Sequence, residues 1–98
     1  MNLGLNLLGL AQRAGKLASG EQTVLQNIRN QNAKLVLLCS DASDNTQKNI
    51  RDKCNFYHIE LRVVYTSDQL SAALGKKRFV CALLDSGFSK RMDEIIQG

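Results

Sequence analysis

Proline is absent from the sequence, and histidine and cysteine are scarce, with one and three residues. Because there is no proline, no Pro-rich linker divides the chain, and no low-complexity tract interrupts it. Hydrophobic residues make up 44% and charged residues 22% of the 98 residues, close to the globular average. We therefore expect one folded domain over residues 1–98 with a single modest core.

The few histidines and cysteines also argue against a metal site. Cys39, Cys54 and Cys81 are an odd number without metal-type spacing, and only Cys54 and His58 are close in sequence. A zinc ion would need further ligands that no nearby residue supplies. We expect no metal and no cofactor, and we interpret the cysteines as buried thiols in a reducing cytosol.

Long hydrophobic runs are lacking as well. The N-terminal run Met1–Leu10 is apolar, but it is far shorter than a membrane span and no basic leader precedes it. We expect a cytoplasmic protein with no export signal and no membrane partner.

Positive charge is in moderate excess, because 13 basic residues against nine acidic ones leave a net charge of +4. This charge attracts polyanions but does not by itself distinguish nucleic acid from acidic protein or lipid headgroups. The one tight basic cluster is Lys76-Lys77-Arg78, and a looser group in the first third of the chain comprises Arg13, Lys16, Arg29 and Lys34. Taken singly, each of these residues is equally well explained as solvated surface charge.

Four segments have the character of strands. The continuous apolar runs Leu35–Cys39 and Phe79–Leu84 predict strands that are covered on both faces. The segment Leu61–Tyr65 is β-branched and aromatic, and Arg62 within it indicates a position near the sheet edge. A short stretch at Lys16–Ala18 predicts a fourth strand.

Helical spacing fills the segments between these strands. We expect a first helix that ends at Gly15 and a third helix that follows Asp41–Asp44 and runs to about Asn55. A fourth helix should begin with the capping box Thr66–Gln69, and a last helix should follow Ser86-Gly87. The predicted core faces are Leu3, Leu7, Leu10, Ala11 and Ala14 in the first helix, Leu70, Ala73 and Leu74 in the fourth, and Met92, Ile95 and Ile96 in the last.

Alternation of helices and strands with crossovers of this length predicts an α/β fold. The expected architecture is a three-layer α-β-α sandwich around a central four-stranded sheet, mostly parallel or mixed. In such folds, ligands usually gather at the carboxyl ends of strands and at helix N-termini.

The segment Ser19–Gln22 carries the most information about function. Ser19 and Gln22 have capping-box spacing, so a second helix is predicted to start here and to bury Val24, Leu25 and Ile28. A glycine at a helix N-terminus lets another backbone approach the free amides, whose partial positive charge suits phosphate. The polar face Gln22, Gln26 and Arg29 could meet base edges and phosphate. An ordinary capped surface helix explains the same residues, and the segment alone leaves both readings open.

The basic cluster Lys76–Arg78 follows Gly75 and precedes the last apolar strand, so it should lie at the N-terminal end of that strand. Basic side chains there would neutralise phosphate, and binding would weaken as salt increases. Phe79 is better explained as the first residue of the buried strand than as a platform for a base.

An enzymatic alternative rests on Asp41 and Asp85, which each end an apolar strand where phosphatases and receiver domains keep carboxylates. The sequence has no glycine-rich phosphate loop and no strong nucleophile–base pair, and Asp44 fits helix capping better than a third metal ligand. We therefore expect no catalysis, with Asp41 and Asp85 capping the elements that follow them.

Three motifs, Ser19–Val24, Ala33–Ser43 and Leu84–Gly87, resemble the ribosomal protein family named for the archaeal protein L-seven-Ae, and most of all its bacterial YlxQ-like branch. The resemblance covers nearly the whole chain, and the Ala-Lys-Leu-Val run that begins at Ala33 is its most specific part. It implies an α-β-α sandwich that binds kink-turn RNA, a sharply bent duplex with sheared G·A pairs beside an internal loop, and it implies no catalysis.

In that family the glycine-led start of the second helix enters the RNA groove at the G·A pairs, and the loop before the last strand covers extruded bases. The resemblance assigns the helix role to Gly20, Glu21, Gln22, Thr23 and Gln26, and the loop role to Lys76, Lys77, Arg78 and Phe79. With the neighbouring charged residues, the expected RNA-binding set is Lys16, Gly20, Glu21, Gln22, Thr23, Gln26, Arg29, Asp41, Lys76, Lys77, Arg78 and Phe79.

The chain departs from the family pattern at several contact positions. Gln22 stands where Asn or Lys is usual, Thr23 where Glu is frequent and Gln26 where Lys is usual, while Gln69-Leu70-Ser71 replaces the common Glu-Leu-Gly. Losing a lysine removes roughly one phosphate contact, whereas Gln22 still presents an amide to a base edge.

Two functions follow from these observations. The first is non-catalytic binding of structured RNA, kink-turn or ribosomal, linked to the ribosome or translation. The second is a protein-interaction module of the translation machinery with weak RNA affinity. The expected partners are structured RNA and ribosomal proteins, and the expected state is a monomer.

Overall fold

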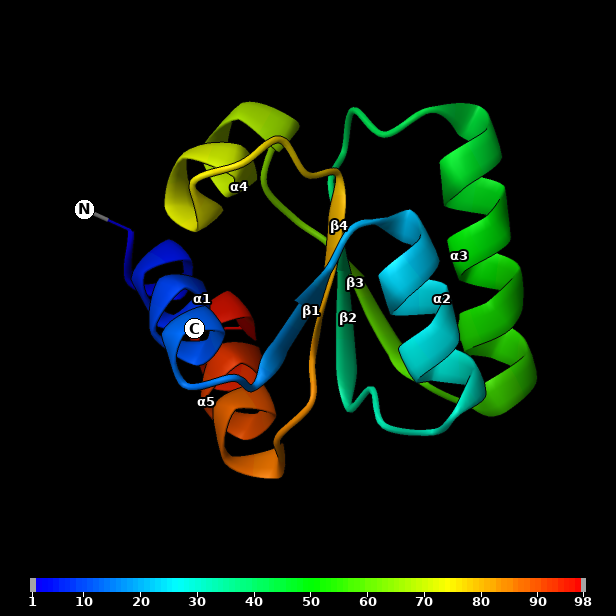
Figure 1. The fold of residues 1–98 in the computed structure, drawn as a ribbon, viewed down its shortest axis with the longest axis horizontal. Helices are drawn as coiled ribbons and strands as arrows, with labels where there is room; N and C mark the ends of the chain where they lie inside the picture. The colour runs from blue at the N-terminus through cyan, green and yellow to red at the C-terminus, as the bar shows by residue number, and fades with distance from the viewer. Residues whose placement is uncertain (1, 98) are drawn as a thin grey trace.

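A computed structural model describes residues 2–97 and places five helices around a four-stranded sheet (Figure 1). The elements in chain order are α1 (Leu3–Arg13), β1 (Leu17–Ser19), α2 (Glu21–Arg29), β2 (Leu35–Leu38), α3 (Asp44–Tyr57), β3 (Glu60–Val63), α4 (Ser67–Leu74), β4 (Val80–Leu83) and α5 (Ser86–Gln97). Helices α1, α4 and α5 cover one face of the sheet, and α2 and α3 cover the other. The predicted α/β fold with three layers is confirmed.

The sheet is mixed, with the strand order β1-β4-β2-β3. Only β2 and β3 are parallel, because β4 runs antiparallel to both of its neighbours. The sequence predicted a sheet that is mostly parallel or mixed, and the structure has the mixed arrangement. The reason is α4, which is only about 12 Å long and turns the chain at the end of the sheet where β2 and β3 finish. A helix that does not carry the chain back along the sheet leaves the next strand antiparallel.

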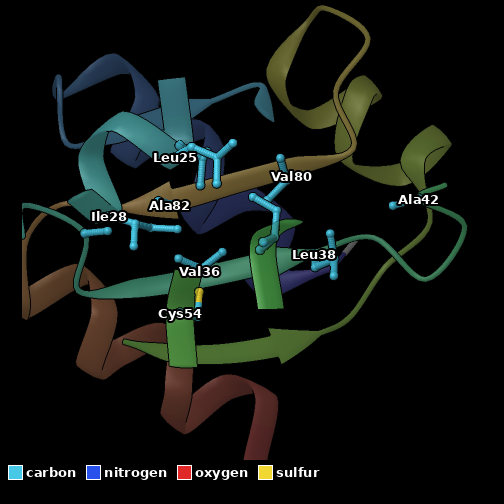
Figure 2. Close-up of a cluster of buried hydrophobic side chains, with 11 residues drawn as sticks. Leu25, Ile28, Val36, Leu38, Ala42, Cys54, Val80 and Ala82 are labelled. Atoms are coloured by element: carbon cyan, nitrogen blue, oxygen red, sulfur yellow. The ribbon is translucent and has the colours of Figure 1, made fainter. Parts of the chain in front are cut away.

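The central strands β2 and β4 are buried along their whole length. Alternate side chains point to opposite faces, so Val36, Leu38, Val80 and Ala82 pack beneath α2 and α3 (Figure 2). The intervening residues Leu35, Leu37, Cys81 and Leu83 pack against α1, α4 and α5. Burial on both faces explains why these strands have continuous apolar sequences.

All three cysteines are free and buried. Burial raises the pKa of the Cys39 and Cys54 thiols to about 11 and raises the pKa of Cys81 further still. These thiols therefore stay protonated near neutral pH, and they behave as small hydrophobic side chains.

The buried face of α1 differs from the face predicted. Leu3 and Leu10 are 65% and 50% exposed, and Ala14 is exposed too, whereas Gly4, Leu8 and Ala11 are buried. The helix is rotated because the small Gly4 allows other side chains to pack closely against its backbone, which a pattern of leucines does not reveal. In α4 and α5, Leu70, Leu74 and Met92 are buried as expected, while Ala73, Ile95 and Ile96 are partly buried.

The capping box predicted at the start of α4 is confirmed, and it is formed by Thr66 and Gln69. Helix α3 begins at Asp44 after Ser43 as its cap, and it continues to Tyr57, beyond the expected end at Asn55. The helix ends at His58, its C-cap residue, which adopts the left-handed conformation with φ of 58°. Within residues 2–97, none of the helices combines the length and apolar character that crossing a bilayer requires.

Two glycines of α1 offer a matched test of this packing. A Cβ added at Gly4 would collide with the Tyr65 hydroxyl and lie 2.9 Å from Cε of Met92, whereas a Cβ at Gly9 would lie 3.5 Å from the nearest atom, the Ala73 carbonyl oxygen. We expect Gly4→Ala to lower the free energy of unfolding by about 1–3 kcal/mol and Gly9→Ala to raise it by about 0.5–1 kcal/mol. Urea denaturation measures both, and equal stability of the two variants would contradict the packing described for α1.

Candidate nucleic-acid interface

Two segments predicted to bind RNA lie side by side at one end of the sheet. Strand β1 finishes where β4 starts, because Ser19 pairs with Cys81 and the Gly20 amide donates to the Val80 carbonyl at 3.0 Å. The N-terminus of α2 therefore adjoins the basic loop, which we define as Gly75–Phe79, between α4 and β4 (top of Figure 1). The antiparallel direction of β4 is what brings them together.

The first turn of α2 has no side-chain cap. Gly20 is the N-cap residue, with φ of 91° and ψ of 147°, and its carbonyl accepts the first helical hydrogen bond from the Val24 amide at 2.9 Å. The predicted capping box at Ser19 is wrong, because Ser19 ends β1 and its hydroxyl accepts from Arg78 instead. The amides of residues 21–23 precede the first helical hydrogen bond, so they concentrate the partial positive charge of the helix dipole.

The outer face of α2 is polar, as the periodicity predicted. Gln22, Thr23, Gln26 and Arg29 are exposed, and Val24, Leu25 and Ile28 are buried against the sheet. The outer face therefore offers two amide groups, a hydroxyl and a guanidinium to a partner. Amide groups can donate to and accept from a base edge, and a guanidinium suits phosphate.

Glu21 does not join this outer face. Its carboxylate accepts hydrogen bonds from the Thr46 hydroxyl at 2.6 Å and from the Asn49 side chain at 3.1 Å, both on α3. The bond from Thr46, followed by that from Asn49, holds the pKa of Glu21 below its ordinary value. Glu21 therefore ties the start of α2 to α3. The sequence did not reveal the roles of Thr46 and Asn49, because they lie 25 and 28 positions away from Glu21 and no local pattern links residues so far apart.

Ser71 and Arg78 shape the basic loop. The Ser71 hydroxyl accepts from the Arg78 amide at 2.9 Å and donates to the Arg78 carbonyl at 3.3 Å, so it closes the loop against α4. The Arg78 side chain turns inward, where Nε donates to the Ser19 hydroxyl at 2.9 Å and Nη1 donates to the Lys77 carbonyl at 2.9 Å. Lys76 and Lys77 are exposed and are the other two cationic residues of this loop.

Phe79 lies between the core and the surface. It is partly buried against the cluster beneath α2 and α3, as a residue at the start of a buried strand should be, and the Lys77 ammonium lies 5.7 Å from its ring centroid. A cavity of about 230 Å³ opens beside it, lined by Gly20, Glu21, Thr46, Lys77, Arg78, Phe79 and Val80. This volume is below the ~300–1,000 Å³ of ordinary small-molecule pockets, so it suits one protruding group of a larger partner.

Lys16 lies away from this interface. Its carbonyl accepts from the Leu84 amide, just beyond the end of β4, whereas Gly20 meets the beginning of that strand. The two residues are therefore at opposite ends of β1. The structure brings the start of α2 next to the basic loop, whereas Gln26 and Arg29 lie further along α2. Asp41 lies near Lys77 and has a separate role.

Asp41 and Asp85 both act as helix caps. The Asp41 carboxylate accepts from the Ser67 amide at 2.8 Å and from the Ser67 hydroxyl at 2.6 Å, and these bonds together with Lys77 lower its pKa. We had expected Asp41 to cap α3, the next helix along the chain, but it caps α4 instead. The parallel strands β2 and β3 end side by side, and this brings Asp41 next to the start of α4. Asp85 accepts from the Phe88 amide at 2.9 Å and caps α5 as predicted. No three ligand-type side chains within residues 2–97 cluster as a metal site would require.

The contact of Glu21 with α3 predicts a pH dependence of stability. Because the pKa of Glu21 is lower in the folded chain, the carboxylate stabilises the fold above its unfolded pKa, and this stabilisation is lost as pH falls through the folded pKa. We expect Glu21→Gln to be less stable than the wild type at pH 7 by under ~1 kcal/mol, with the difference closing towards about pH 3. Urea denaturation at both pH values measures it, with Asp52→Asn on α3 as the charge-matched control. A difference that persists unchanged at low pH would contradict the role given to Glu21.

Comparison with known proteins finds relatives that match this chain over nearly the full length of both proteins. It is 40% identical to the RNA-binding protein YlxQ of Enterococcus faecium over 94 residues, covering 96% of this chain and 91% of that protein. It is 46% identical to the RNA-binding protein YlxQ of Bacillus subtilis (strain 168) over 91 residues, covering 92% and 91%.

Solved structures have the same fold. A Bacillus halodurans protein of unknown function superposes with a TM-score of 0.94 at 39% identity, and both chains are covered completely. The Giardia lamblia 15.5kD RNA binding protein superposes with a TM-score of 0.76 at 17% identity, covering 95% of this chain and 81% of that one. A family model described as ribosomal protein L7Ae/L30e/S12e/Gadd45 matches residues 4–92. This chain therefore belongs to the ribosomal protein L7Ae/L30e/S12e/Gadd45 family.

Proposed function

We propose that this chain binds structured RNA without catalysing a reaction, through the outer face of α2 and the basic loop. The observation that carries the proposal is the uncapped N-terminus of α2 lying beside the exposed Lys76 and Lys77. Membership of the L7Ae/L30e/S12e/Gadd45 family and two relatives named RNA-binding proteins support it.

Phosphate groups would supply most of the affinity. The start of α2 and the basic loop that carries the exposed Lys76 and Lys77 lie at the same end of the sheet, where a bent RNA backbone could meet both. Arg29, near the end of α2, extends this contact along the helix. Each neutralised phosphate releases counterions, so the affinity should fall steeply as salt increases.

Base edges would supply the specificity. The major groove of regular A-form RNA is too deep and narrow for protein side chains to read, so α2 requires a site where the duplex is opened or bent. A kink-turn with sheared G·A pairs provides such a site, and Gln22 and Gln26 present amides that match guanine and adenine edges. We therefore propose kink-turn-like RNA as the target class.

A role in the ribosome or in translation is the second part of the proposal. Its support is the family, whose description names ribosomal proteins. Ribosomal RNA would then be the natural source of the bent duplex, and ribosomal proteins would be neighbours on the same particle.

The decisive experiment compares two RNAs in a gel-shift series across a salt titration. One RNA contains a kink-turn, and the other is identical except that its G·A pairs are replaced by Watson–Crick pairs. We expect tighter binding to the kink-turn RNA at every salt concentration. Equal, weak binding to both RNAs would contradict the proposal.

Charge at the basic loop should act on all RNAs alike. We expect Lys77→Gln to weaken binding to both RNAs by a similar factor and to reduce the slope of log K against log salt by about 1, since one phosphate contact is lost. Lys34→Gln is the matched control, because Lys34 is exposed at the opposite end of the sheet, where its amide donates to Leu83. An equal effect of both substitutions would place the RNA elsewhere.

Gln22 should act on specificity instead. We expect Gln22→Ala to reduce the preference for the G·A-containing RNA by about five- to a hundredfold, while the salt slope stays the same, because an amide contact to a base carries no charge. The ratio of the two dissociation constants measures this. If the preference is intact in Gln22→Ala, then base readout does not depend on this residue.

A further inference from the structure

We propose that Arg78 is a positioning residue that holds the N-terminus of α2 in its binding geometry, rather than a residue that contacts phosphate. This inference rests on the proposed RNA-binding function and assigns Arg78 a role different from that of its lysine neighbours. Composition alone groups Arg78 with Lys76 and Lys77, but the geometry of the three side chains differs.

The Arg78 side chain reaches across from the basic loop to the β1–α2 junction. Its Nε donates to the Ser19 hydroxyl at 2.9 Å, and its Nη1 donates to the carbonyl of Lys77 at 2.9 Å. The side chain is partly buried, whereas those of Lys76 and Lys77 are exposed. Two of the three guanidinium nitrogens are therefore engaged within the protein.

Gly20 lies beside the Arg78 side chain. A Cβ at Gly20 would lie 3.6 Å from Nε of Arg78 and 3.8 Å from its Cδ and Cζ, so the guanidinium packs along the glycine backbone. Gly20 has φ of 91° and ψ of 147°, a conformation that residues with a Cβ rarely adopt. Arg78 thus lies against the residue that determines the direction in which α2 begins.

The backbone of Arg78 is fixed by hydrogen bonds as well. Its amide and carbonyl both bond to the Ser71 hydroxyl on α4, and the Gly20 amide bonds to Val80, two residues further along. A continuous set of hydrogen bonds therefore runs from α4 through Arg78 to Ser19 and the start of α2. Holding this junction rigid before RNA arrives reduces the ordering that binding must supply, which increases affinity without any new contact to the RNA.

Arginine is required for this role because its Nε–H lies within a planar fork, and lysine has a methylene group at the same distance along the side chain. Arg78→Lys keeps the positive charge and removes the bond to Ser19. Ser19→Ala removes the same bond from the other side and changes no charge. The two substitutions together separate the charge of Arg78 from its hydrogen bond.

The binding test measures the affinity and the salt slope of Arg78→Lys, Ser19→Ala and the double variant on the kink-turn RNA. We expect each single variant to bind about three- to tenfold more weakly, the double variant to bind no more weakly than either single one, and the salt slope to remain that of the wild type. Lys76→Gln is the control for a phosphate contact, with a slope reduced by about 1. If Arg78→Lys binds as the wild type does, while Arg78→Gln loses both affinity and slope, then Arg78 is a phosphate contact and the proposal is wrong.

A second measurement, made on the free protein, does not depend on RNA. The amide of Gly20 donates to Val80 across the junction, so its hydrogen exchange reports how often the junction opens. We expect Arg78→Lys and Ser19→Ala to accelerate this exchange by similar factors, and Lys76→Gln to leave it unchanged. Exchange at Gly20 that is unaltered in both variants would overturn the positioning role. If the wild type binds the kink-turn RNA and the control RNA equally, the proposed function is wrong. The exchange measurement still tests whether Arg78 positions the junction.

Discussion

The candidate interface depends on the insertion of β4 between β1 and β2. All four of its residues, Val80–Leu83, are buried and pair with β2, and Cys81–Leu83 also pair with β1, so this strand joins the two halves of the sheet and the two hydrophobic clusters. Because β4 is antiparallel to its neighbours, it starts where they finish. The basic loop that precedes β4 is thereby placed next to the start of α2, so the two segments lie side by side.

Much of the fold could be predicted from the sequence, because burial leaves a periodic pattern. The continuous apolar runs of β2 and β4 indicated two-sided burial, and Thr66 and Gln69 marked the start of α4. The direction of β4 could not be predicted in this way. It depends on where the short α4 lies, and the contact between Asp41 and Ser67 that caps it joins residues 26 positions apart. The buried face of α1 was missed for a related reason, since Gly4 is buried for its small size and not for its hydrophobicity.

The candidate site was predictable to the extent that it is local. Periodicity alone identified the exposed face of α2, and the basic cluster was visible as three adjacent cationic residues. The orientations of Glu21 and Arg78 were not predictable, because each is determined by hydrogen bonds to partners distant in sequence. Ser19 lies 59 residues from Arg78, and Thr46 lies 25 residues from Glu21. Charged residues that look alike in a sequence can therefore differ in role, since some face a partner and others hold the protein together.

The three buried thiols have a practical consequence for site-specific labelling. A thiol with a pKa near 11 has only about one part in ten thousand in the reactive thiolate form at pH 7, and burial keeps reagents away from it. A maleimide dye should therefore react with a single cysteine engineered on the outer face of α2 and leave Cys39, Cys54 and Cys81 unmodified. Fluorescence measurements with such a dye should therefore not require replacement of the three native cysteines in the core.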